Sequence, residues 1–241
     1  MHLNLYLIAM KGILKTFLIC LIASCLAWTS NAQQFIWAKG GGTIFDFSSL
    51  PSYENESVEF MCTDPNGNVY AVSQVGNDPV TADTFHASPY GAEQNILLTS
   101  YSCSGQMRWA KLIASSGGPS WALGITADSL GHLYVSGIMP GGTLHIGNDT
   151  TLPGAVYDLA ALVQFDTSGH FNWIRYVGNN TMASYDVTGT IRGALTIDGA
   201  NNAHFIPYIG SGAVLMPSVT SVYGSYDLTY NPAGTLLSAS E

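Results

Sequence analysis

The sequence predicts an all-β protein, a β-propeller of four-stranded antiparallel blades. Three landmarks recur in the same order about every 65 residues. Each landmark is a short run rich in Val, Ile, Leu, Tyr and Thr beside an Asp/Asn/Ser/Gly cluster, and no segment keeps a helical period. Two hairpins per repeat make a four-stranded sheet, and stacked sheets of this kind bury both faces as propeller blades do.

The first landmark is a tryptophan inside a short strand. It occurs as Phe35-Ile-Trp-Ala-Lys39, Met107-Arg-Trp-Ala-Lys111 and Phe171-Asn-Trp-Ile-Arg175, so the tryptophans lie 72 and 64 residues apart. A large aromatic at a fixed place in each blade is expected to pack between adjacent sheets. Stacking on a sugar is the weaker interpretation.

The second landmark is an Asp-x-x-Gly turn. It occurs as Asp64-Pro-Asn-Gly-Asn-Val-Tyr70, as Asp128-Ser-Leu-Gly-His-Leu-Tyr134 and, degenerately, as Asp198-Gly-Ala-Asn-Asn-Ala-His-Phe205. The Asp side chain can accept a hydrogen bond from the backbone two residues on, and the Gly adopts the left-handed conformation that closes a hairpin. Asn201 replaces this Gly in the third copy, and Asn is the next most tolerant residue of positive φ.

The third landmark is an apolar strand that leads into a second turn. The strands are expected at 95–101, 158–165 and 227–230, with turns at 102–105, 166–169 and 231–234. The predicted blades cover residues 57–112, 121–176 and 191–240. The connections inside them, near 75–94, 139–157 and 210–224, are rich in Gly, Pro and Thr and are expected to be surface loops or short edge strands.

Residues 1–32 have the order of a secretory signal peptide. Lys11 and Lys15 precede an apolar run, and Ser30 and Ala32 are the small residues before a cleavage site after Ala32. The repeats over 33–241 would then be secreted or displayed at the cell surface. A lipoprotein signal at Cys25 is the weaker interpretation, and an anchor helix is weaker again because the apolar run is short.

Two cysteines, Cys62 and Cys103, follow the signal. Export permits a disulfide between them. Their expected places on strands one and three of one blade lie about 10 Å apart, which favours two partly buried thiols over a bridge.

Composition excludes several classes of function. The chain has 16 acidic and 7 basic residues, and only 10% of its residues are charged. An acidic chain with few bases lacks the footprint for nucleic acid, and a hydrophobic content of 47% is too high for a disordered polyelectrolyte. No stretch after the signal is long and apolar enough for a transmembrane helix.

These repeats resemble the SBBP-type β-propeller repeat of secreted bacterial proteins, common in Bacteroidetes. Residues 121–138 and 158–173 are most similar to the family pattern, apart from Gln164 where the family often has Lys. The resemblance covers nearly all of 35–241 and implies a propeller of four-stranded blades. The family carries no shared catalytic residues, so the resemblance assigns none here.

Three blades are too few to close a ring, because closure takes about four to eight. The strand at 35–39 has no blade of its own, and the last expected strand ends one residue before Glu241. The sequence therefore predicts an incomplete ring, a chain with further blades beyond its C-terminus, and an exposed apolar face on the third blade. The total number of blades stays open.

No residue set has the spacing of a catalytic, cofactor or metal site. His132 and His170 are expected to be exposed turn residues, and none of the histidines after the signal has metal-ligand spacing; the others are His86, His145 and His204. Residues 64–68 supply one carboxylate where a calcium loop needs several, so a hairpin turn is favoured. Glu54, Glu56 and Glu59 are expected to form a solvated loop rather than a catalytic pair.

We therefore expect a secreted or cell-surface scaffold that binds a protein or a glycan through its inter-strand loops, without catalysis. The aromatic residues that would contact a sugar are Tyr90, Trp121, Tyr157 and Tyr223. Two alternatives stay open. One is a fragment of a propeller enzyme, of the polysaccharide lyase or hydrolase type, with carboxylates converging at the ring centre. The other is a structural adhesin segment without a ligand.

Overall fold

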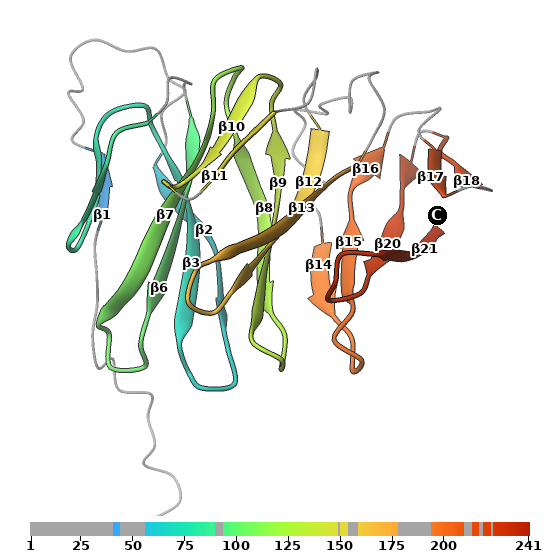
Figure 1. Ribbon diagram of the computed structural model, residues 1–241, viewed down its shortest axis with the longest axis horizontal. Helices are drawn as coiled ribbons and strands as arrows, with labels where there is room; N and C mark the ends of the chain where they lie inside the picture. The colour runs from blue at the N-terminus through green and yellow to red at the C-terminus, as the bar shows by residue number, and fades with distance from the viewer. Residues whose placement is uncertain are drawn as a thin grey trace, which may run out of the picture. The chain divides into compact units, whose positions relative to one another are not determined.

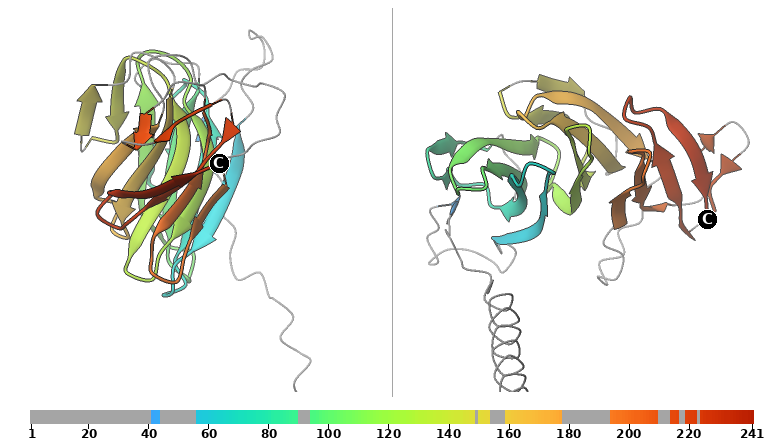
Figure 2. Two further views of the ribbon diagram at one scale, coloured as in Figure 1. Left: turned by 90° about the vertical axis from the view of Figure 1, so that its right-hand side faces the viewer. Right: turned by 90° about the horizontal axis from the view of Figure 1, so that it is seen from below.

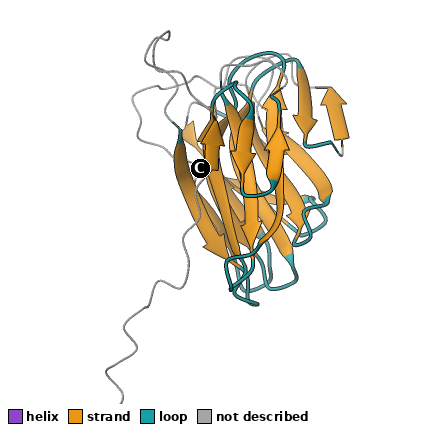
Figure 3. Ribbon diagram, turned by 90° about the vertical axis from the view of Figure 1, so that its left-hand side faces the viewer, coloured by secondary structure: helices purple, strands orange, loops and turns teal. Residues whose placement is uncertain are grey.

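The computed structural model describes residues 41–43, 56–89, 94–148, 150–153, 159–177, 194–209, 214–216, 219–222 and 224–241. Strands and loops make up these residues, and no helix occurs among them (Figure 3). The predicted signal at 1–32 and the predicted strand at 35–39, with Trp37, lie outside them. None of the described segments is a helix long and apolar enough to cross a membrane.

Three antiparallel sheets form the body of the fold (Figure 1). The first sheet has the strand order β11-β10-β7-β6-β3-β2, and its strands are β2 (Ser57–Thr63), β3 (Val69–Val75), β6 (Asn95–Tyr101), β7 (Met107–Ser115), β10 (Thr143–Ile146) and β11 (Thr150–Pro153). The second sheet has the order β13-β12-β9-β8, with β8 (Trp121–Ala127), β9 (His132–Met139), β12 (Leu159–Asp166) and β13 (Phe171–Val177). The third has the order β14-β15-β20-β21, with β14 (Ala194–Ile197), β15 (Ala203–Ile206), β20 (Asp227–Tyr230) and β21 (Leu236–Ser240).

Smaller sheets lie in the connections. Strand β4 (Val80–Ala82) pairs with β5 (Phe85–Ala87) and with β1 (Gly41–Thr43). The remaining pairs are β16 (Tyr208–Ile209) with β19 (Gly224–Ser225), and β17 (Val214–Met216) with β18 (Val219–Thr220). The all-β class and the four-stranded antiparallel pattern predicted from the repeats are confirmed.

The turns follow the conformations that the sequence predicts. Gly67, Gly131 and Asn201 close the first hairpin of each sheet with φ of 77°, 91° and 64°. Asn201 therefore adopts the left-handed conformation expected of the Gly that it replaces. The second hairpins close in the same way at Gly105, Gly169 and Gly234.

The connection at 139–157 forms two short strands at a sheet edge, as expected, but at the edge of the first sheet rather than of its own sheet. Its β10–β11 hairpin follows β9 of the second sheet but pairs with β7 of the first, with His145 opposite Ala114. Leu144 and Ile146 alternate with His145 and are fully buried in the core between the two sheets. The hairpin therefore adds two strands to the first sheet and ties two repeats together.

The three sheets follow one another in the views of Figure 2, and the buried side chains cluster between successive sheets. One cluster joins the first and second sheets, with Ile96 and Leu98 of β6 facing Leu133 and Val135 of β9. A second joins the second and third sheets, with Leu162 of β12 among its members; its members from the third sheet include Ala203, Phe205 and Leu228. A third cluster covers the other face of the first sheet and includes β4 residues.

A tryptophan–glycine contact recurs between successive sheets. Trp109 of the first sheet donates from Nε1 to the Thr167 carbonyl at 3.0 Å, and Trp173 of the second donates to the Pro232 carbonyl at 3.1 Å. Each ring covers the glycine two residues further on. A Cβ added at Gly169 would lie 2.7 Å from the Trp109 ring, and one at Gly234 would lie 2.9 Å from the Trp173 ring. Trp109 and Trp173 are therefore packing elements between sheets, as predicted.

The two cysteines do not form a disulfide. Cys62 lies on β2, where burial, followed by the nearby Asp64 charge, raises the pKa of its thiol to about 12. Cys103 is exposed, and it lies in the turn between β6 and β7 rather than on the expected third strand. The expectation of two partly buried thiols is therefore right for Cys62 and wrong for Cys103.

The side of the third sheet that points away from the second sheet, expected to be apolar, is mainly polar among the described residues. We call this side the far face; it carries His204, Asp227, Thr229 and Ser238, and alternation along β15 places Ile206 beside them. His204 lies between Ala203 and Phe205, which are both buried against the second sheet, so its side chain points to the opposite side.

The tryptophan–glycine contact predicts a position-specific cost for added methyl groups. We expect Gly169→Ala to lower the free energy of unfolding by about 1–3 kcal/mol, because the new Cβ meets the Trp109 ring at a φ of 89°. Gly199→Ala is the control, since nothing lies within 4 Å of the added Cβ, and its effect should stay within about 0.5 kcal/mol. Urea titration followed by tryptophan fluorescence measures both. Equal midpoints for the two variants would contradict the contact.

Candidate functional site

A groove of about 500 Å³ lies where two repeats meet on the first sheet. Its floor is Ala110, Lys111 and Leu112 of β7. One wall is Phe85–Ala87 of β5 with Ser88 and Pro89, and the other is Gly147 and Asn148 in the turn between β10 and β11. The walls come from the connections at 75–94 and 139–157, which the sequence identifies as the variable parts of successive repeats.

Backbone contacts hold the groove together. The Gly147 amide donates to the Leu112 carbonyl at 2.8 Å. Gly147 has a φ of 55° and lies against the aliphatic stem of Lys111, where an added Cβ would be 3.7 Å from Cγ. The β10–β11 turn is thereby fixed against β7, so the wall is part of the sheet rather than an independent loop.

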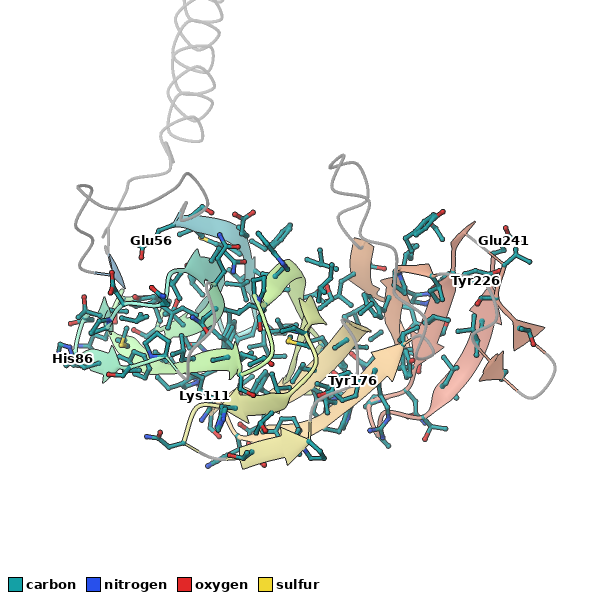
Figure 4. The ribbon with its side chains drawn as sticks, turned by 90° about the horizontal axis from the view of Figure 1, so that it is seen from above. Glu56, His86, Lys111, Tyr176, Tyr226 and Glu241 are labelled. Carbon is teal, nitrogen blue, oxygen red and sulfur yellow. The ribbon has the colours of Figure 1, made fainter. Side chains whose placement is uncertain are left out.

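The groove combines polar and apolar side chains. Lys111 supplies an ammonium group, His86 an imidazole, Asn148 an amide and Ser88 a hydroxyl, while Phe85 and Pro89 supply apolar surface. Figure 4 labels His86 and Lys111, which come from β5 and β7. A few convergent polar groups on an apolar lining are typical of ligand sites in proteins. Neither His86 nor this groove follows from any motif in the sequence.

The carboxylates of the repeated turns serve the fold. Asp64 Oδ1 accepts from the backbone amides of Asn66 and Asn68, both at 2.9 Å, and its Oδ2 accepts from Asn68 Nδ2 and the Tyr70 hydroxyl. Burial alone would raise the pKa of Asp64, but these hydrogen bonds outweigh it and lower the pKa. Both oxygens are engaged by the turn and by Tyr70 of the following strand, which supports the hairpin interpretation over a calcium loop.

Asp128 and Asp198 repeat this arrangement. Asp128 is buried and accepts from two backbone amides, from His132 Nδ1 at 2.7 Å and from the Tyr134 hydroxyl at 3.2 Å. His132 is therefore a partner of Asp128 and only 27% exposed, so the expectation of an exposed turn residue is wrong. His170 is 77% exposed, as expected.

The predicted aromatic contacts to sugar fall mostly outside the described residues. Tyr90, Tyr157 and Tyr223 lie there. Of the predicted acidic loop, Glu54 also lies there, Glu56 is exposed outside any strand as expected, and Glu59 lies on β2 rather than in a loop. Trp121 begins β8 and is half-buried, with its partner Ile138 on β9. Within the described ranges, no group of three or more His, Cys, Asp or Glu residues is arranged to hold a metal ion.

Comparison with known proteins identifies no relative: no family model matches the chain, and no curated protein matches its sequence.

Asp128 and Asp166 both begin an Asp-x-x-Gly turn, but the burial of Asp128 predicts that its substitution lowers stability more. We expect Asp128→Asn to lower the free energy of unfolding by about 1–3 kcal/mol, because one acceptor of the Tyr134 and His132 hydrogen bonds becomes a donor in a buried place. Asp166→Asn is the matched control, since the Asp166 side chain is 38% exposed and water can replace lost partners. Urea titration with and without calcium is the measurement. A calcium-dependent midpoint that Asp128→Asn abolishes would contradict the structural role.

Proposed function

We propose that this chain is an exported, non-catalytic scaffold of the β-propeller type that binds a protein or a glycan in the groove between its inter-strand connections. The observation that carries the proposal is the groove itself, which two connections from successive repeats build over β7. Three sheets in tandem, each packed on the next, support a propeller-type stack. The resemblance of 121–138 and 158–173 to SBBP-type repeats supports the same assignment.

The side chains of the groove suit a ligand with hydroxyl or carboxylate groups. Lys111 and His86 donate hydrogen bonds to such groups, and Asn148 both donates and accepts. Phe85 and Pro89 offer the apolar surface on which a sugar ring or a peptide side chain packs. The predicted signal with cleavage after Ala32, or lipidation at Cys25, would place this groove outside the cytosol, where glycans and surface proteins occur.

If the ligand binds in the groove, substitutions of groove residues should weaken its binding and a substitution elsewhere should not. A glycan array and a panel of surface proteins, probed with the mature secreted chain, would identify a ligand. We expect His86→Gln and Lys111→Gln to weaken its binding about tenfold each, which corresponds to about 1.4 kcal/mol. His170→Gln is the matched control, because the His170 side chain is exposed in a turn of the second sheet.

Two outcomes would contradict the proposal. Unchanged affinity of both groove variants would remove the groove from the function. Cleavage of polysaccharide by the chain would favour the enzyme alternative, and the carboxylates responsible would then lie elsewhere.

A further inference from the structure

The three sheets place different residues at the same positions of one face. In the first sheet, Tyr70, Ser100 and Trp109 lie opposite one another across β3, β6 and β7. The second sheet has the set Tyr134, Gln164 and Trp173 in the same register, and the third has His204, Thr229 and Ser238. The third sheet therefore lacks the tyrosine and the tryptophan with which the first two sheets contact the next repeat.

A second position on this face is also apolar in the first two sheets and polar in the third. Leu98 of the first sheet faces the core between the first two sheets, and the corresponding Leu162 faces the core between the second and third. The third sheet has Asp227 at this position, paired with Ser240. Asp227 therefore occupies the position at which Leu98 and Leu162 pack against the next sheet.

These polar side chains form one connected cluster. His204 Nδ1 lies 3.1 Å from Asp227, and Nε2 lies 3.5 Å from Asp198 Oδ2 in the turn between β14 and β15. The Ser238 hydroxyl donates to the Thr229 hydroxyl at 2.9 Å, beside the same imidazole. The side chains of His204, Asp227 and Asp198 are 28%, 38% and 34% exposed, whereas Thr229 is 9% exposed and lies within the cluster.

We propose that the far face of the third sheet is an end face, built for water, against which no further repeat with the Tyr–Trp contact packs. Burial of an imidazole and two carboxylates under an apolar sheet would remove their hydration without supplying hydrogen-bond partners. Repeat arrays solve the same problem with a terminal repeat whose outer side is polar. The inference goes beyond the proposed binding function, and it makes the stack of repeats open on this side.

The end face can be tested by restoring the missing pair. We expect His204→Tyr with Ser238→Trp to create an adhesive apolar face, so that the variant self-associates at least tenfold more tightly than the wild-type chain in sedimentation velocity. Thr151→Trp is the control for an exposed tryptophan elsewhere, because Thr151 lies exposed on β11 of the first sheet. Association of the double variant no stronger than that of Thr151→Trp would overturn the proposal.

A second measurement uses the wild-type chain without substitutions. If water covers the far face, deuterium exchange at the His204 ring C–H in the full chain should proceed within about tenfold of that at exposed His170. Exchange slower by several orders of magnitude would show that another part of the molecule covers the far face, and would overturn the proposal even if the double variant failed to fold.

The cluster also predicts a pH dependence. The hydrogen bond to Asp227 raises the pKa of His204 against the opposing effect of burial, and the charges of Asp227 and Asp198 add to the rise. Among the described residues, Asp198 and Asp227 are the titratable groups beside the imidazole; β14 places Thr196 opposite His204, and Ser238 of β21 bonds to Thr229. Because the folded pKa exceeds the unfolded value, this stabilisation is complete below about pH 6.5 and is lost as pH rises through the folded pKa.

Urea midpoints between pH 5 and pH 9 check this dependence. We expect the wild-type midpoint to fall as the pH rises above about 6.5, and we expect His204→Gln to remove this fall and His170→Gln to keep it. An unchanged profile in His204→Gln would show that the imidazole is not held between the two carboxylates, and would contradict the cluster.

Discussion

Burial of apolar residues on both faces of a sheet is the constraint on which the rest of this structure depends. All seven residues of β6 are buried, with Ile96 and Leu98 in one core cluster and Leu97 in another. Each such side chain contributes about 1.5–3 kcal/mol when removed from water. A sheet standing alone would lose several of these contributions, which together equal the typical net stability of a domain. Each sheet is therefore stable only with a neighbour on each apolar face.

The tryptophan–glycine contact sets how neighbouring sheets meet. Trp109 and Trp173 donate to backbone carbonyls, so the residue that supplies the carbonyl can be Thr167 in one turn and Pro232 in the next. The glycine two residues further on has no such freedom, because the indole ring occupies the space of a Cβ. The tryptophans and the turn glycines therefore recur in the sequence, while the position that supplies the carbonyl varies between Thr167 and Pro232.

The sequence predicted what local chemistry decides and missed what distant pairing decides. The hairpins, the Asp-x-x-Gly turns and the left-handed Asn201 depend on neighbouring residues, and all three are present. The pairing of β10 with β7 joins different repeats, and the alternating Leu144 and Ile146 were its available signal. The groove was missed for the same reason, since its walls come from two repeats. His132 is an exception, because its partner Asp128 lies in its own turn; the burial of Asp128, beside which His132 is only partly exposed, has no signal in the local sequence.

The backbone of each turn is the same whichever residue occupies the face of its sheet. Asp198 accepts from the Ala200 and Asn202 amides as Asp64 and Asp128 do in their turns, and the third sheet keeps the common register although its far face is polar. In each turn Oδ1 of the carboxylate accepts from backbone amides, while Oδ2 lies beside a different face residue in each sheet, Tyr70, Tyr134 or His204, so the strand pairing does not require one particular side chain on the face. A tyrosine–tryptophan face that packs on a neighbour and a histidine–threonine–serine face can therefore occupy the same backbone. Repetition of the backbone thus says little about function, which resides in the connections and in the faces that depart from the repeat.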